Sequence, residues 1–563
     1  MKASVFGNVY PIKIQAVLDE YRAGEPILGR LVQGKCDDIV VIGRVVNAYR
    51  TSDIMNEYIP AKHISKQQDL LTAQALLHQW SGVILEIDLI TALKDGKRVT
   101  LNFLLEHLSE VHFLEDFPVK QTPHTGYLGS FYGSEIKAPF VLQDFQTLRE
   151  AYHFFITGQT GSGKSTLAQM LLALYHRKNP NMSFLILDTV GEFTASFEKK
   201  GDMFLHLKDV WKGKVEIYTP PENLALEGWD IFKEICLEYD VMKIIDIPAI
   251  STENTDNGIS AIVDMLKERI NMLKVKDNRK STEYLTPNIV ESTIKSLAID
   301  EQLLDKFVKK VYKSSEPSRD RIRNAIRDPQ TLQLFIKKIK DVAELFCTVN
   351  TNKKIIQDVV KDFSELAVNG KSGKCVVLNF TLEKTGFDTK HLRSKYVRET
   401  LKALYSEGIK LYSQRGNINL NTLVVLEEAH NYAPKYPDDE ELKNLSNDIV
   451  RYFIETRKFG IGWCCITTSP SNVRREIFEN TRVRFIGPGL TSGPNAELLR
   501  ENFGSEILNL YKLLPDPSDP LSPKKEINFI VSGPITLLSR EKPDFITIFN
   551  TKEEFLKING FQV

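Results

Sequence analysis

A glycine-rich loop between an apolar strand and an apolar-periodic helix constrains this chain more than any other segment. Residues 158–165 are Gly-Gln-Thr-Gly-Ser-Gly-Lys-Ser, with HFFIT before them and STLAQMLLALY from Ser165 onward. Glycines let the backbone approach a phosphate chain closely, with successive N–H groups pointing inward. The spacing G-x-x-x-x-G-K-[ST] predicts a triphosphate-binding loop, followed by a helix whose positive end faces the phosphates.

The polar side chains of this loop have distinct expected roles. Lys164 is expected to reach the β- and γ-phosphate oxygens of ATP, and the Ser165 hydroxyl to bind Mg²⁺. The predicted nucleotide-binding residues are Gly158, Thr160, Gly161, Ser162, Gly163, Lys164, Ser165, Thr166, Asp188 and Glu192. A chance match to the motif is the alternative, and the flanking strand and helix count against it.

Two carboxylates follow a second apolar strand, in the segment LVVLEEAH that begins at Leu423. The carboxyl ends of parallel strands meet at one edge of a sheet, so this segment is expected beside the phosphate loop. Glu427 is predicted to support Mg²⁺, directly or through water, and Glu428 to polarise the attacking water. An ordinary acidic helix start after a strand is the alternative, since glutamate favours a helix N-terminus.

A third apolar strand, FLILDTVGEF, also ends in acids. Asp188 is expected at its carboxyl end, with Glu192 four residues further on. These carboxylates are predicted to lie around the metal or at the nucleotide edge of the site, and a plain loop is the alternative.

The transition state also requires positive charge, for which two candidate segments are visible. Arg457 lies just before the strand WCCITT, and Arg482 and Arg484 lie in ENTRVRFIG. Arg457 and Arg482 are the candidate catalytic arginines, acting in cis or across a subunit interface; solvated or salt-bridged arginines are the alternative. Thr467 and Thr468 end the WCCI strand, where they are expected either to sense the γ-phosphate or to cap the strand.

The order of strands and helices predicts an α/β fold: a RecA-like P-loop NTPase core with a small N-terminal β-barrel and a helical insertion. Residues 1–115 are expected to form the barrel. Residues 116–221 are expected to form the first part of the core, residues 222–368 the helical insertion, and residues 369–563 the second part with C-terminal strands.

Several shorter segments carry predictions of their own. The Pro- and Gly-containing stretch 116–150 is interpreted as a linker with short extended pieces. Lys94-Asp95-Gly96-Lys97 predicts a hairpin turn, and 55–80 is expected to be partly helical. The last strands, within 526–549, are expected to close the sheet or to reach a neighbour.

Composition limits the partners. Lys plus Arg and Asp plus Glu are both 73 among 563 residues, so any DNA-facing charge must be local. The six cysteines form no C-x-x-C pair, which favours buried reduced thiols, with a zinc site as the minor alternative. The N-terminus lacks an apolar signal core and the apolar runs are too short to span a bilayer, so we expect a cytoplasmic protein without a membrane partner.

The motifs together resemble a known family. The order GQTGSGKST, LDTVGEF, VVLEEAHNYAP, ETRKFGIG, ITTSPSNV and NTRVRF is similar to that of the HerA branch of the HerA–FtsK ATPases. Paired glutamates in LEEAH are the most specific element, and GRLVQG and VIGRVV resemble the family's N-terminal barrel. The sequence departs from the family at Thr468, where glutamine is common, and at Tyr152, where a basic residue is common.

The resemblance implies a homo-hexameric, ATP- and Mg²⁺-dependent translocase of double-stranded DNA that works with a nuclease. It also implies that Glu428 is the catalytic base, and that Arg457 and Arg482 surround the γ-phosphate. Several HerA-like proteins are encoded beside antiviral effectors of the nuclease or NADase type, so a ring scaffold in an antiphage complex is an alternative. A secretion or conjugation motor is a third hypothesis, and a nucleotide kinase is disfavoured.

Overall fold

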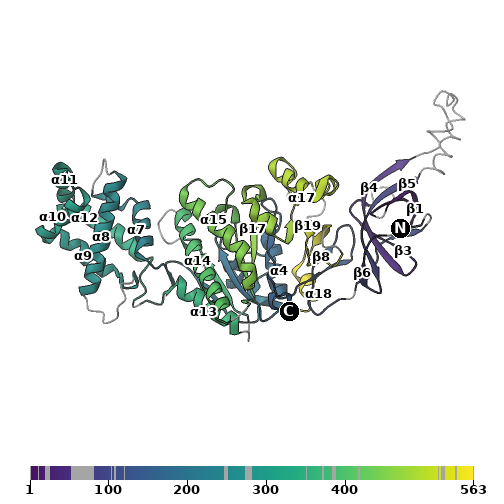
Figure 1. Ribbon diagram of the computed structural model, residues 1–563, viewed down its shortest axis with the longest axis horizontal. Helices are drawn as coiled ribbons and strands as arrows, with labels where there is room; N and C mark the ends of the chain where they lie inside the picture. The colour runs from purple at the N-terminus through teal and green to yellow at the C-terminus, as the bar shows by residue number, and fades with distance from the viewer. Residues whose placement is uncertain are drawn as a thin grey trace, which may run out of the picture.

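The computed structural model is elongated and has three parts: a β-barrel, a central α/β domain and a helical module at the far end (Figure 1). The expected partly helical segment 55–80 lies outside the described residues. These are 2–10, 12–18, 26–51, 82–102, 104–106, 109–119, 121–245, 251–272, 282–349, 351–369, 373–382, 389–415, 419–517, 519–521, 526–538 and 542–561.

Six strands close the N-terminal barrel, in the order β2-β1-β7-β3-β4-β5, with β2 paired to β5. Alternating apolar residues fill it, because successive side chains of a strand point to opposite faces. The turn Asp95-Gly96 joins β5 to β6, with Lys94 opposite Lys97, so the predicted hairpin and barrel are confirmed. The strands are β1 (Lys2–Tyr10), β2 (Lys13–Leu18), β3 (Leu31–Cys36), β4 (Ile39–Thr51), β5 (Gly82–Lys94), β6 (Lys97–Val99) and β7 (Glu110–Phe113).

The central domain contains a sheet of 11 strands, in the order β12-β15-β11-β16-β17-β10-β18-β19-β20-β8-β9. The run from β12 to β18 is parallel, and the rest pairs antiparallel. The strands are β8 (Thr125–Phe131), β9 (Lys137–Val141), β10 (Phe154–Thr157), β11 (Ser183–Asp188), β12 (Val215–Tyr218), β15 (Cys375–Asn379), β16 (Thr422–Leu426), β17 (Ile461–Thr467), β18 (Val483–Ile486), β19 (Asn528–Ser532) and β20 (Asp544–Ile548).

The edge strands of this sheet correct one prediction and settle another. The stretch 116–150 is not only a linker, because β8 and β9 are strands of the main sheet. They join through β20, which pairs with β8 antiparallel. The C-terminal strands β19 and β20 therefore extend the chain's own sheet. Of the two arrangements expected from the sequence, this is closure of the chain's own sheet, not contact with a neighbour.

Helices cover both faces of the parallel strands, as an α/β fold requires. Phe184 and Ile186 of β11 pack in one apolar cluster with α4 (Lys164–Lys178). The alternate residues Leu185 and Leu187 pack in the other cluster, with α14 (Thr389–Arg415) and α15 (Glu440–Glu455). No helix of the described residues is both long enough and apolar enough to cross a membrane.

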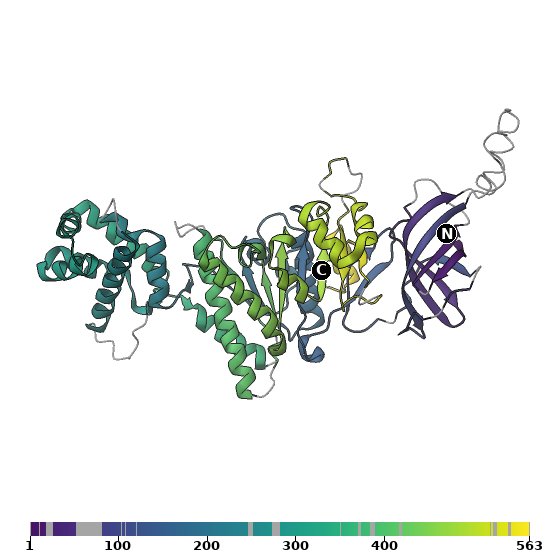
Figure 2. The same ribbon diagram turned by 45° about the horizontal axis from the view of Figure 1, so that its top comes forward.

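A bundle of helices forms the module at the far end from the barrel (Figure 2). Its apolar faces belong to the same cluster as α14 and α15, so its core is continuous with one face of the sheet. Its helices are α7 (Trp229–Glu238), α8 (Thr252–Met272), α9 (Pro287–Ile299), α10 (Glu301–Val311), α11 (Glu316–Arg327) and α12 (Pro329–Ala343). The chain returns through α13 (Ile356–Asn369), which packs on α14.

The buried ammonium of Lys395 fixes this module to the core. Lys395 is 1% exposed, and its Nζ lies 2.6 Å from Glu238 of α7 and 2.9 Å from Glu441 of α15. Glu234 of α7 is a third partner, at 3.1 Å. A buried charge is tolerated only with such partners, so this cluster specifies how the module sits on the core.

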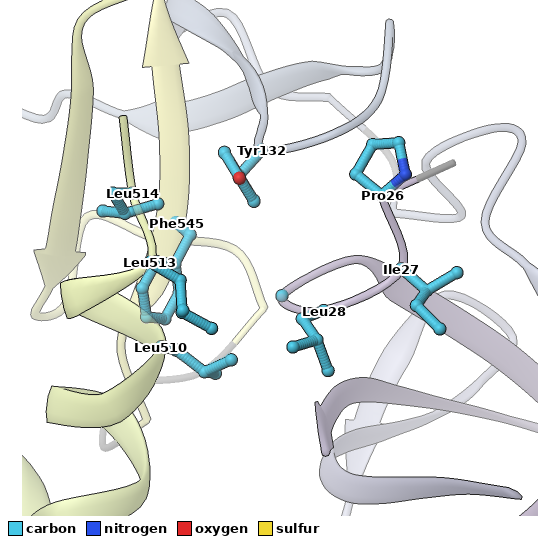
Figure 3. Close-up of a pocket in the computed structure, with 9 residues that line it drawn as sticks. Pro26, Ile27, Leu28, Tyr132, Leu510, Leu513, Leu514 and Phe545 are labelled. Atoms are coloured by element: carbon cyan, nitrogen blue, oxygen red, sulfur yellow. The ribbon is translucent and has the colours of Figure 1, made fainter. Parts of the chain in front are cut away.

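The barrel meets the other end of the core beside α17 (Gly493–Lys512). Figure 3 shows apolar side chains of the two parts facing each other across a cavity of about 290 Å³. Leu28 comes from the barrel, while Leu510 and Phe545 come from the core. Polar contacts also join the two parts: Lys542 Nζ lies 2.7 Å from Asp88 Oδ1 and donates to Leu89 O at 2.9 Å.

Candidate nucleotide site

The sheet order brings the ends of four parallel strands together. Strand β17 lies between β16, which leads to the paired glutamates, and β10, which leads to the glycine-rich loop. Thr467 pairs with Thr157 at the ends of β17 and β10, and Leu426 pairs with Leu187 at the ends of β16 and β11. The loop, the two glutamates and Asp188 therefore share one edge of the sheet.

The glycine-rich loop has the backbone that its sequence predicts. Gly161 and Gly163 have φ values of 80° and 77°, in the left-handed region that glycine adopts without strain. A Cβ at Gly158 would lie 2.5 Å from Ser162 Oγ, so a side chain there would displace Ser162. Helix α4 begins directly after Gly163, and no side chain caps it, so its first N–H groups are open to an anion.

Lys164 points back onto its own loop. Its Nζ donates to the carbonyl oxygens of Gly158 and Gln159, both at 3.0 Å. Burial lowers the pKa of Lys164, and the nearby charges of Glu428 and Glu192 oppose that shift. The ammonium is thus held at the mouth of the loop by neutral acceptors, which a phosphate oxygen can replace.

The residues at this edge fit Mg-ATP. Thr157 Oγ1 and Ser162 Oγ are buried and have no hydrogen-bond partner in the described part of the chain. Ser165 and Thr166 at the start of α4 are half-buried, and Thr160 and Gly161 are exposed. Open backbone donors, unpartnered hydroxyls and one lysine are the groups that a triphosphate requires.

Glu427 and Asp188 form a buried carboxyl pair behind the loop. They are 3% and 0% exposed. Burial raises the pKa of Glu427 well above its usual range, and Asp188 adds to that shift by its charge and by a hydrogen bond. Burial and Asp188 thus favour the neutral form of Glu427, whereas a bound Mg²⁺ would favour its ionised form.

Asp188 also stabilises the turn that follows its strand, a role that was not predicted from the sequence. Its two carboxylate oxygens accept hydrogen bonds from Gly191 N at 2.7 Å and from Thr194 N at 2.6 Å, at the start of α5 (Glu192–Glu198). Glu192 is half-buried in the first turn of that helix. Asp188 and Glu192 thus lie at the site edge, with Asp188 fixing the turn between them.

Glu428 has different surroundings from Glu427, and its charge reaches Lys164 of the glycine-rich loop. Its backbone has φ 47° and ψ 48°, the left-handed conformation that residues other than glycine seldom adopt. Its Oε2 lies 3.2 Å from His430 Nδ1, and its charge acts on Lys164. The two glutamates therefore face different surroundings: one is buried against Asp188, and the other lies 28% exposed at the loop.

The two candidate arginines lie at the opposite edge of the sheet. Arg457 precedes β17 and Arg482 precedes β18, whereas the glycine-rich loop follows β10, which runs parallel to both strands. Arg457 Nε lies 2.7 Å from Glu150 Oε1, and Arg482 Nη1 lies 3.0 Å from Glu150 Oε2. Neither side chain is near the chain's own loop, so action on the chain's own nucleotide is excluded, and both arginines form the salt bridges that the alternative interpretation expected.

Sequence reasoning missed two residues that organise these groups. Glu150 joins Arg457 and Arg482, and His430 joins Glu428 to Thr467, with Nδ1 3.0 Å from Thr467 Oγ1. His430 lies within the motif LEEAH, so its nearness to the paired glutamates was the available signal. Glu150 carried no signal, because its partners are more than 300 residues away in the sequence.

The fold and this edge of the sheet define a P-loop nucleotide-binding protein of the α/β class. Residues 128–381 match the family model described as the central domain of helicase HerA. The match runs from β8 through the glycine-rich loop and the helical module to the end of β15. The central part of the chain, residues 128–381, is therefore similar to the central domain of helicase HerA.

Several solved structures are similar to the chain at low identity. VirB4 of Thermoanaerobacter pseudethanolicus is 13% identical with a TM-score of 0.38, over 77% of this chain and 99% of that one. The pCW3 conjugation coupling protein TcpA with ATPgS is 12% identical with a TM-score of 0.28, over 95% and 93%. The genome packaging NTPase B204 from Sulfolobus turreted icosahedral virus 2, in complex with AMPPCP, is 8% identical with a TM-score of 0.28, over 71% and 98%. No curated protein matches the chain.

Proposed function

We propose that this chain hydrolyses Mg-ATP at the edge where β10, β16 and β17 end. The glycine-rich loop binds the phosphates through backbone N–H groups, and Lys164 moves from its loop carbonyls to the β- and γ-phosphate oxygens. Ser165 and Glu427 hold Mg²⁺, which supplies positive charge to the phosphate oxygens when bound. Glu428 orients the attacking water and accepts its proton. The observation that carries this proposal is that the charge of Glu428 acts on the loop residue Lys164, while Glu427 is buried against Asp188.

The same proposal assigns the hydrolysis cycle to movement of double-stranded DNA by a homo-hexamer. Its support is the HerA central domain together with the position of Arg457 and Arg482. A pair of half-exposed arginines at the edge opposite the site has no nucleotide within its own chain. In a ring of like-oriented subunits, that edge of one copy lies against the site of the next, so the arginines reach a neighbour's γ-phosphate.

A scaffold for a separate effector enzyme, of the nuclease or NADase type, is the second candidate function. The observation that favours it is the fixed attachment of both flanking parts, the barrel through Lys542 and Asp88 and the helical module through Lys395. A core that holds its flanking domains through buried or half-buried ion pairs is suited to present them as docking surfaces. In this alternative the nucleotide governs assembly, and DNA does not stimulate hydrolysis.

ATP hydrolysis by the purified chain, with and without duplex DNA, separates these candidates. Hydrolysis that duplex DNA accelerates, and that both Lys164→Ala and Glu428→Gln reduce by at least about 100-fold, supports the translocase. The matched control for Glu428→Gln is Glu407→Gln on α14, where Glu407 forms an ion pair with Lys410 and lies outside the site; it is expected to leave the rate unchanged. Nucleotide binding with slow hydrolysis that DNA does not change supports the scaffold. Undiminished hydrolysis by Glu428→Gln contradicts the assigned base.

A further inference from the structure

His430 lies between the proposed catalytic base and the strand that separates it from the phosphate loop. Its Nδ1 is 3.0 Å from Thr467 Oγ1, with which it forms a hydrogen bond, and 3.2 Å from Glu428 Oε2. One ring nitrogen therefore faces an oxygen of each residue. Neither the nucleotide-binding motif nor the paired glutamates assign a role to this histidine.

Thr467 is placed by the sheet itself. It is the last residue of β17 and is fully buried, and it pairs with Thr157, the residue directly before the glycine-rich loop. Its Oγ1 accepts a hydrogen bond from Ser469 N at 3.3 Å, which holds the hydroxyl at the strand end. A group bonded to Thr467 is consequently anchored to the same strand ends that carry the phosphate loop.

In the described part of the chain, the Glu428 carboxylate lacks a hydrogen-bond donor that His430 can supply. Among the described residues, its Oε2 is buried and accepts no hydrogen bond of good geometry. A buried carboxylate oxygen without a donor is costly, and its direction is poorly fixed. His430 Nδ1 lies 3.2 Å from that oxygen, which is within the range of an N–H···O hydrogen bond.

The chemistry of the contact selects one imidazole tautomer. An ionised carboxylate only accepts hydrogen bonds, so Nδ1 must carry the proton to approach Glu428 Oε2. With the proton on Nδ1, Thr467 Oγ1 also acts as an acceptor, and its own hydroxyl proton is free to point elsewhere. The opposite tautomer would place a lone pair against the carboxylate.

We propose that His430 is a positioning residue for the hydrolysis of ATP, and that its Nδ1–H holds the Glu428 carboxylate in line with Thr467 and the phosphate loop. The inference deepens the proposed function and rests on it, since it concerns the same reaction. His430 touches neither nucleotide nor water in this role; it acts through Glu428. Its side chain is 26% exposed, so it contributes little to the apolar core.

Substitutions of His430 that retain an N–H donor near Nδ1, or place it elsewhere, test this positioning role. Asparagine places an amide N–H close to the position of Nδ1, whereas glutamine places its amide nearer to Nε2. In single-turnover hydrolysis, His430→Ala is expected to lower the rate constant by about 10–100-fold, as loss of an orienting partner does. His430→Asn is expected to recover most of that loss and His430→Gln little of it. The affinity for a fluorescent ATP analogue is expected to stay within about threefold in all three variants, because the phosphate loop is intact.

Two further variants complete the experiment. His112→Ala on the barrel, a half-exposed histidine beside Glu110, is the control and is expected to match the wild-type rate. The double variant Thr467→Val with His430→Ala is expected to lower the rate constant by less than the product of the two single-variant factors. Both substitutions disrupt the same chain of contacts from Thr467 through His430 to Glu428.

The outcomes separate this inference from the proposed function. If wild type hydrolyses ATP, Glu428→Gln does not, and His430→Ala equals wild type, the inference is wrong while the function stands. Equal losses in His430→Asn, His430→Gln and His430→Ala also overturn it, as does a nucleotide affinity that falls in step with the rate. Absence of hydrolysis by wild type itself rejects the proposed function, and the positioning role with it.

Discussion

The guanidinium of Arg44 in barrel strand β4 lies 3.2 Å from the carboxylate of Asp544 in core strand β20, and both side chains are 3% exposed. Arg44 also donates to the carbonyl oxygen of Pro543, and its guanidinium carbon lies 4.9 Å from the ring centroid of Phe545. A buried ion pair satisfied in this way fixes the orientation of its two elements more than it adds stability. The barrel is thereby held in one position on the ATPase core.

Removing one member of this pair is expected to destabilise the protein strongly. Arg44→Met leaves Asp544 buried without its cation, so we expect a loss of about 3–5 kcal/mol in the free energy of unfolding of the unit that contains the pair. Thermal unfolding of the whole chain measures the change. The control is Lys94→Met, which removes the exposed barrel ion pair with Asp38 and is expected to leave the unfolding midpoint almost unchanged. Equal midpoints for the two variants would contradict the structural role of Arg44.

The same pair gives stability a defined pH dependence. Burial raises the pKa of Asp544 to about 6, although the charge of Arg44 acts in the opposite direction. The pKa is higher in the folded than in the unfolded protein, where it is about 3.9, so the folded form binds the extra proton between these values. Wild type is therefore expected to gain stability relative to Asp544→Asn as the pH falls from about 6 to about 4, by on the order of 2 kcal/mol. Unfolding midpoints of both proteins across that range measure it; a constant difference would show that Asp544 titrates normally.

The arginines paired with Glu150 are expected to act on a neighbouring subunit's nucleotide. Arg457→Ala removes an ion pair that is 40% and 34% exposed, so a change in stability below about 1 kcal/mol is expected. ATP turnover is nonetheless expected to fall by about 10³-fold, which is the effect of losing an arginine at a transferring phosphate.

Mixing inactive variants tests whether this action crosses subunits. In a mixture of Arg457→Ala and Lys164→Ala, the sites of the first variant are intact and receive Arg457 from the second, so activity is expected to reappear. The control mixture of Glu428→Gln with Lys164→Ala has no intact site and is expected to stay inactive. No recovery in the first mixture would rule out contact across an interface.

The local features of the site could be predicted because each depends on a short stretch of chain. The glycines at 158, 161 and 163 impose the loop, and the apolar segment that follows forms the helix, whatever lies around them. The acids at 427 and 428 end an apolar strand, and parallel strands end at one edge, so their place beside the loop also followed from sequence. The closed barrel and the α/β sheet followed in the same way from the order of strand-like and helical segments along the chain.

Only the tertiary structure determined which surroundings, and therefore which roles, neighbouring residues have. Glu427 and Glu428 are adjacent in sequence and the backbone is left-handed at Glu428; Glu427 is buried against Asp188, whereas Glu428 lies beside His430 and its charge acts on Lys164. The order of strands put Thr467 between the glutamates and the loop, where His430 meets it. Arg457 and Arg482 fell at the far edge because each precedes its strand, whereas the loop follows its own. Such relations depend on which strands become neighbours, and that is set by packing between distant segments, which no local pattern encodes.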